Sequence, residues 1–193
     1  MSAADRAWLR LHRVALAEFD LRVRQIPPDH WAASTPCEEW DVYDLVRHNT
    51  AENRWATALL AGAVGDDGDH ADGEMGDGGT DPTDAWEESR LESLAAFKGC
   101  DLDAQVELSQ GSRSVLDVLV ERVTELTVHS WDLARGIGAD ETLDDELVGA
   151  VWAHWWPRRE VLARQAGLLE PALDPPLDAD LQTRLLALFG REA

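Results

Sequence analysis

The apolar residues of this chain recur at spacings of three and four along most of its length, which is the period of an amphipathic α-helix. The first such stripe occupies residues 5–25 and ends at a pair of prolines, because proline cannot continue a helix. A second stripe begins after Asp41, a good N-cap residue, with Trp40 and Leu45 placed as a hydrophobic staple. The first third of the chain therefore predicts two helices.

The remainder of the chain predicts three longer helices and a short one. The longest of them ends at Gly136 and Gly138, since glycine adopts the backbone angles that terminate a helix. A short extended piece is expected at Val106–Leu108, before a turn at Gly111. Several substantial helices with short additional ones indicate an all-α fold, a four-helix bundle with a C-terminal helical tail. The predicted helical ranges are 81–99, 114–135, 143–156 and 180–189.

The predicted bundle occupies residues 1–157, and residues 158–193 form a short C-terminal extension. Within the bundle, residues 61–80 are rich in Gly and acidic side chains and are interpreted as a flexible, solvated loop. A calcium-binding loop is the alternative. That alternative needs oxygen ligands at alternate positions followed by glycine, and no register within residues 66–77 provides them.

Composition limits the partners. The formal net charge of −21 argues against nucleic acid and anionic membranes, which both need a basic surface. No apolar run approaches the roughly 20 residues that cross a bilayer, and the N-terminus lacks the apolar core of a signal peptide. Two cysteines are too few for a disulfide framework. We expect a soluble, cytoplasmic protein.

Candidate chemistry lies on two predicted helices. Glu125 and His129 are four residues apart, which places them on one helix face with Cβ atoms roughly 5–6 Å apart. His48 falls on an otherwise apolar face of its own helix. Two histidines and one carboxylate would hold a divalent metal and leave coordination positions open. Taken singly, the Glu–His pair is also compatible with a chance surface pair, and His48 with a core histidine.

Four segments carry a family resemblance. They are STPCEEWDVYDLVRH (34–48), the helix from Asp81-Pro82 to Phe97, ELTVHSWDLARGIG (125–138) and LLALFGRE (185–192). In this order they resemble the mycothiol-dependent maleylpyruvate isomerase family, within the DinB-like superfamily of metal-binding four-helix bundles. The resemblance implies a metal site at His48, Glu125 and His129, with zinc, or another divalent cation such as nickel or iron, and mycothiol as co-substrate.

The resemblance also implies a reaction. A low-molecular-weight thiol binds the metal as thiolate and attacks a small electrophile, so that the protein is an isomerase or a thiol S-transferase. The family's isomerase carries a sizeable C-terminal domain, whereas only residues 158–193 follow Pro157 here. This departure favours an electrophile other than maleylpyruvate. The alternative is a non-catalytic helical bundle that binds a metal or a small ligand.

Four further residues are candidates for a substrate pocket. Asn49, Glu52 and Trp55 follow His48 by one or two helical turns and could line its mouth, although Trp55 also suits core packing. Asp132 follows His129 by three residues and suits either an acceptor that orients this histidine or a surface ion pair. A structural role is favoured over catalysis for Cys37.

Other aromatic and histidine residues are left without a specific function. The chain has nine tryptophans, and for the cluster near the end of the bundle both core packing and a homodimer face are open. The remaining histidines show no partner in the sequence. The residues concerned are Trp152, Trp155 and Trp156, and His12, His30, His70 and His154.

Overall fold

The structure is a computed structural model that describes residues 2–37, 40–62, 81–108, 111–160 and 172–193. Most of the predicted acidic loop, its calcium-loop alternative and His70 lie outside these residues. The described helices are α1 (Ala3–Val23), α2 (Val42–Leu60), α3 (Pro82–Gly99), α4 (Val115–Ile137), α5 (Asp145–Trp155), the 3₁₀ turn η1 (Trp156–Arg158) and α7 (Leu181–Leu188).

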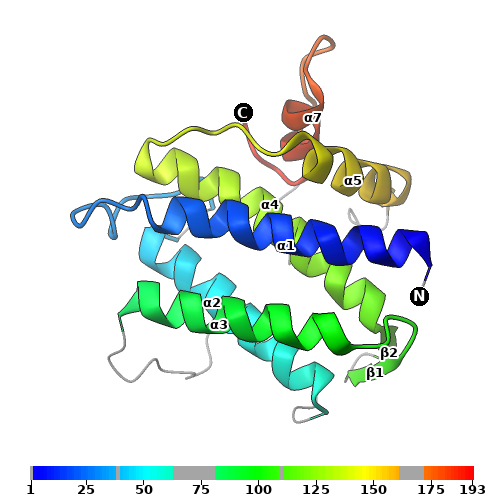
Figure 1. Cartoon of the computed structure of the whole chain (residues 1–193). Helices are drawn as coiled ribbons and strands as arrows, with labels where there is room; N and C mark the ends of the chain where they lie inside the picture. Colours follow the sequence, from blue (N-terminus) through cyan, green and yellow to red (C-terminus); the bar gives the residue numbers. More distant parts are fainter. Residues whose placement is uncertain (1, 38–39, 63–80, 109–110, 161–171) are drawn as a thin grey trace.

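Four of the helices form a closed bundle. α1 packs on α4, α4 on α2, α2 on α3, and α3 on α1, so each helix has two neighbours (Figure 1). α5 lies against α4 and α1, and α7 lies against α5. The expected all-α bundle is confirmed. None of the helices in the described part of the chain combines the length and apolar character that crossing a bilayer requires.

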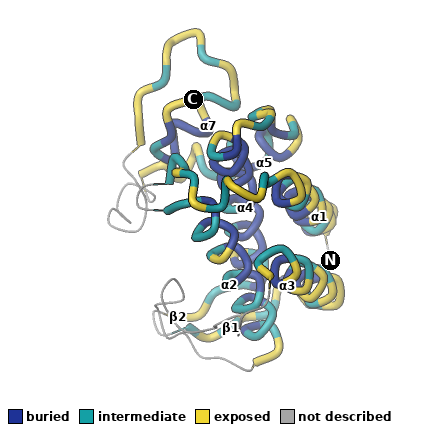
Figure 2. Tube along the Cα trace, turned by 90° about the vertical axis from the view of Figure 1, so that its left-hand side faces the viewer, coloured by how far each residue is buried: buried dark blue, intermediate teal, exposed yellow. Residues whose placement is uncertain are grey.

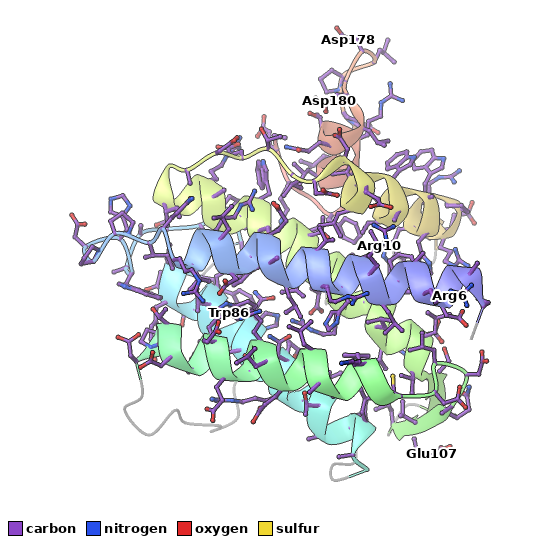
Figure 3. The ribbon with its side chains drawn as sticks, in the orientation of Figure 1. Arg6, Arg10, Trp86, Glu107, Asp178 and Asp180 are labelled. Atoms are coloured by element: carbon purple, nitrogen blue, oxygen red, sulfur yellow. The ribbon has the colours of Figure 1, made fainter. Side chains whose placement is uncertain are left out.

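The core lies between the four helices, and their outer faces are exposed (Figure 2). Trp86, labelled in Figure 3, lies on α3 where this helix meets α1. Its ring is 4.7 Å from that of Phe19, and its indole N–H donates to Asp20 at 3.1 Å. The α1–α3 contact thus buries a large aromatic side chain without leaving its one polar atom unsatisfied.

A polar side chain that the sequence left unassigned also lies in the core. His12 of α1 is almost completely buried; its Nε2 lies 3.3 Å from the Ser93 hydroxyl, and its ring packs edge-on against Phe97. Burial, with the charges of Arg122 and Arg13, lowers the pKa of His12 to about 3. At neutral pH His12 is therefore a neutral structural residue.

The predicted helix ends are mostly confirmed. The side chain of Asp41 accepts the backbone N–H of Asp44 at 2.9 Å, as an N-cap should. Gly138 follows α4 in the left-handed conformation, with φ of +69°. The prediction that Gly136 also ends this helix is wrong, because α4 continues through Ile137.

Gly136 has a different role. A Cβ atom at this position would lie 3.2 Å from the Thr35 methyl group, 3.3 Å from the Ser34 carbonyl oxygen and 3.3 Å from a Val42 methyl group. These residues belong to the loop before α2 and to the first turn of α2. The missing side chain therefore allows the end of α4 to approach the beginning of α2.

A small hairpin precedes α4. Strand β1 (Gln105–Leu108) pairs antiparallel with β2 (Gly111–Ser114), with Gln105 opposite Ser114. The expected extended piece is confirmed, whereas the second strand was not predicted, since Gly-Ser-Arg-Ser has no apolar alternation. Ser114 ends β2 and also caps α4, its hydroxyl accepting the Asp117 N–H at 3.1 Å. The hairpin thus fixes where α4 begins.

The tryptophans near the end of α5 divide into two groups. Trp155 is half-buried and donates its indole N–H to the Thr124 hydroxyl of α4 at 2.7 Å, which fits the core-packing alternative. Trp152 stacks on Trp156 with ring centroids 4.6 Å apart, and Trp156 is 44% exposed. A homodimer face at this surface stays a prediction.

The C-terminal segment is fastened to the bundle by a buried ion pair. Arg191, which follows α7, donates to the Asp132 carboxylate of α4 at 3.0 Å and to the Phe189 carbonyl at 2.8 Å. The Asp132 side chain is fully buried, and that of Arg191 is 7% exposed. Because each charge compensates the other away from water, removal of either is costly for the one that remains buried.

Replacement of Gly136 by alanine should cost stability. Alanine in a helix interior normally stabilises by about 0.5–1 kcal/mol relative to glycine, but here its methyl group would press against Thr35, Ser34 and Val42. The control is Gly149→Ala in α5, where a Cβ atom would meet nothing within 4 Å. In urea denaturation we expect Gly149→Ala to raise the free energy of unfolding and Gly136→Ala to lower it. Equal stabilisation by both variants would contradict the close approach.

Loss of the Arg191 charge should destabilise the protein strongly. Arg191→Met keeps the length of the side chain but removes the guanidinium that pairs with the buried Asp132 carboxylate, and we expect the free energy of unfolding to fall by about 3–5 kcal/mol. Arg24→Met is the control, because Arg24 is 55% exposed and pairs with Asp20 and Glu87 at the surface; a loss below about 1 kcal/mol is expected there. Similar small losses in both variants would argue against a compensating role for the buried pair.

Candidate functional site

Two of the predicted site residues meet where α2 packs against α4. The rings of His48 and His129 lie 5.4 Å apart, centroid to centroid, and cross at 79°. Trp40, which precedes α2, covers this pair: its ring is 4.5 Å from that of His48 and 6.1 Å from that of His129. The sequence placed Trp40 only as a staple residue. The two imidazoles therefore share one aromatic-walled, largely buried environment.

Both histidines are neutral in this environment. Burial lowers the pKa of His48 to about 4; the positive charges of Arg122 and Arg47 add to the shift, and the negative charge of Glu125 opposes it. Burial also lowers the pKa of His129 well below its usual value, with contributions from His48, Arg191 and Arg122. Each ring therefore keeps a lone pair for a hydrogen-bond donor or a metal. Nδ1 of His48 is buried and has no hydrogen-bond partner among the described residues.

Asn49 holds His129 in place. The Asn49 side chain is fully buried and donates through Nδ2 to the Leu45 carbonyl at 2.9 Å. Nδ1 of His129 lies 3.1 Å from the same Nδ2 and 3.4 Å from Oδ1. The amide can thus support either tautomer of the ring. With the proton on Nδ1 donated to Oδ1, the Nε2 lone pair is free, as metal-binding histidines require. This places Asn49 behind the imidazole, whereas its role in a substrate pocket stays a prediction.

The third predicted ligand, Glu125, is engaged elsewhere. Its carboxylate forms an ion pair with Arg122 one turn earlier on α4 and is 39% exposed. Within the part of the chain that the structure describes, no three His, Cys, Asp or Glu side chains are arranged as a metal site. The structure thus brings the two histidines together and holds the carboxylate on a neighbouring guanidinium.

Glu52 supplies a second carboxylate near Arg122. It lies one turn after His48 on α2, and its Oε2 is 4.0 Å from Nη1 of Arg122. Burial, reinforced by the negative charges of Glu125 and Glu121 and opposed by Arg122, raises the pKa of Glu52 to about 7. Glu52 can therefore carry or release a proton near neutral pH.

The remaining candidates lie around this centre. Trp55 is half-buried and packs against the hydrophobic core, as the core alternative anticipated, and its pocket role stays a prediction. Asp132 forms the buried ion pair with Arg191 rather than a surface one. Cys37 is half-buried, and its backbone N–H donates to the Thr35 hydroxyl at 3.2 Å.

Sequence reasoning missed Arg122 and Arg191, two nearly buried arginines whose charges act on the histidines. Arg191 lies in the LLALFGRE segment that contributed to the family resemblance, but its partner Asp132 is distant in the chain. Arg122 lies three residues before Glu125, and nothing in the local sequence marks it as buried. Neither burial nor pairing can be read from these positions in the sequence.

The histidine pair suits a divalent cation. Two neutral imidazoles lie side by side, a buried imidazole nitrogen lacks a partner among the described residues, and an amide can fix the proton of the other ring. Glu125 supplies a hard oxygen ligand one turn from His129 if its carboxylate leaves Arg122. Two histidines and a carboxylate are donor types that zinc or a similar ion binds, and in this structure Arg122 holds the carboxylate.

Comparison with known proteins places these features in a family. The model of the mycothiol maleylpyruvate isomerase N-terminal domain matches residues 12–134, which include α2, both histidines and Glu125. Two uncharacterized proteins of Mycobacterium tuberculosis, from strains CDC 1551 / Oshkosh and ATCC 25618 / H37Rv, are each 28% identical over 143 residues. The alignments cover 72% of this chain and 72% of each relative. No solved structure matches the chain significantly.

The family match confirms the resemblance found in the sequence, and with it the DinB-like character of the four-helix bundle. The chain belongs to the mycothiol maleylpyruvate isomerase N-terminal domain family.

Proposed function

We propose that this protein is a divalent-metal-dependent enzyme that uses a low-molecular-weight thiol of the mycothiol type. It acts as an isomerase or a thiol S-transferase on a small electrophile. The observation that carries the proposal is the edge-on approach of two neutral, largely buried imidazoles, His48 and His129, inside a domain of this family. We place the reaction in the cytoplasm, where free thiols stay reduced.

The chain's own residues have distinct parts in this proposal. His48 and His129 hold the cation, which is zinc or an ion such as nickel or iron, and Glu125 completes the ligand set. A bound divalent cation lowers the pKa of a thiol from its usual value of about 8.5, which favours the thiolate at neutral pH. Asn49 accepts the Nδ1 proton of His129 in the tautomer that leaves Nε2 for the cation.

Trp40 acts on the substrates in this scheme. It forms an aromatic wall beside both imidazoles and excludes water from one side of the site.

The proposal predicts metal content and thiol dependence together. Purified protein should contain about one Zn²⁺ or similar ion per chain, and His129→Ala should lose both this metal and thiol-dependent activity. His154→Ala is the control, because His154 is a half-buried histidine of α5 that packs against Trp8 and Trp155. Metal analysis by mass spectrometry and a screen of electrophiles with and without mycothiol provide the measurements.

Three outcomes decide between the functions. Turnover that is equally fast without thiol would contradict thiol chemistry. Metal binding with ligand-dependent thermal stabilisation but no product would favour the alternative, a metal- or ligand-binding bundle without catalysis. Full metal retention in His129→Ala would remove this histidine from the ligand set.

A further inference from the structure

One buried guanidinium serves two carboxylates at the α2–α4 contact. The Arg122 side chain is 2% exposed, and its Nη1 forms the ion pair with Glu125 on the same helix. The same Nη1 lies 4.0 Å from Oε2 of Glu52 on α2. Both acids are thus within reach of one nitrogen, but only Glu125 is bonded to it.

The second terminal nitrogen of this guanidinium, Nη2, forms hydrogen bonds to α2. Nη2 of Arg122 donates to the Asn53 side-chain oxygen at 3.2 Å and to the Asn49 carbonyl at 3.5 Å. These bonds fix the position of the guanidinium and leave Nη1 to interact with the acids. A small shift of either carboxylate would therefore suffice to change the partner of Nη1.

Glu52 shares its ion-pair partner with Glu125. Its side chain is only 14% exposed, and Arg122, 4.0 Å away, is the one described side chain of opposite charge within ion-pair distance of it. A largely buried carboxylate gains little from a counter-charge at that distance. The Arg122 guanidinium could approach Glu52 more closely if Glu125 were absent.

α2 and α4 each carry a histidine and a glutamate four residues apart, in opposite order along the chain. His48 and Glu52 are four residues apart on α2, and Glu125 and His129 are four residues apart on α4. The histidines meet at 5.4 Å, and both carboxylates face Arg122. Two acids against one guanidinium leave excess negative charge beside two neutral imidazoles, which a cation would compensate.

We propose that Arg122 exchanges its carboxylate partner when a divalent cation binds. It releases Glu125 to the His48–His129 pair and takes Glu52 in its place. This inference rests on the proposed function. It makes Arg122 and Glu52 positioning residues: Glu52 keeps the guanidinium paired while Glu125 is on the metal, so neither state leaves Arg122 without a carboxylate. It also gives a role to Glu52, which lies 4.0 Å from its nearest counter-charge.

A double-mutant cycle separates this exchange from a general effect of charge. Zn²⁺ affinity is measured by chelator competition for wild type, Glu52→Gln, Arg122→Gln and the double variant. We expect Glu52→Gln to weaken binding about 10–100-fold in the wild-type background, as loss of supporting groups does at metal sites. In the Arg122→Gln background, where Glu125 is already free, the same change should alter affinity by less than roughly threefold. An equal loss in both backgrounds would overturn the exchange.

Glu121→Gln is the matched control. Glu121 is also on α4, its negative charge acts on Glu52, and it pairs with Arg113 instead of Arg122. If removal of any nearby negative charge weakened Zn²⁺ binding, Glu121→Gln would behave like Glu52→Gln, which would contradict a specific exchange. We expect a change below roughly threefold for Glu121→Gln.

A structure of the zinc-loaded wild-type protein tests the same inference without any variant, which matters if Arg122→Gln fails to fold. Nη1 of Arg122 should then lie within about 2.7–3.2 Å of Glu52, and a Glu125 oxygen about 2.0–2.2 Å from the metal. A retained Arg122–Glu125 pair beside bound zinc would overturn the exchange and leave the proposed function standing. Failure of wild type to bind zinc, nickel or iron would remove both. A third outcome would remove only the exchange. In it, His129→Ala loses zinc, but the effects of Glu52→Gln and Arg122→Gln on Zn²⁺ affinity are additive.

Discussion

The packing of α2 against α4 controls the chemistry of the candidate site. It places the rings of His48 and His129 5.4 Å apart, buries His129 and shields most of His48 from water. A proton on either ring would lose its hydration and repel a proton on the other, so the pair stays neutral with lone pairs available. The absent side chain of Gly136 allows the end of α4 to lie close to the start of α2. A feature of helix packing thus determines the protonation state of the site.

Two segments outside the bundle helices complete the surroundings of this pair. Trp40, in the loop before α2, covers both imidazoles from one side. Arg191, near the C-terminus, pairs with Asp132 one turn after His129, and its charge helps to lower the pKa of that histidine. Residue 191 lies beyond the range that the family model matches. The C-terminal segment is therefore coupled to the site through an ion pair, although its described residues contribute no ligand-type side chain to the histidine pair.

Local signals in the sequence predicted the helices, and long-range packing decided what they could not. Apolar periodicity and the caps Asp41 and Gly138 located α2 and α4 within a few residues, since both signals depend only on neighbours in the chain. The strand Gly111–Ser114 was missed because its composition shows no strand pattern. Its extended conformation depends on pairing with Gln105–Leu108. The approach of His48 to His129 was predicted from the family resemblance, whereas the engagement of Glu125 by Arg122 was not, because i,i+3 pairs look alike whether exposed or buried.

Charge also bears on the order in which the proposed enzyme would take up its ligands. Without a cation, an incoming thiolate meets the negative charges of Glu52 and Glu125. Among the described residues, both pair with the single guanidinium of Arg122, in a chain of formal net charge −21. Both the local and the overall field therefore disfavour an anion and favour a cation. With a divalent ion present, the same groups sum to a positive charge, and an anion becomes the preferred next ligand. Under the proposed function, these carboxylates therefore favour binding of the metal before the thiol. Because the two imidazoles are neutral, the net charge of the site depends on the carboxylates and Arg122.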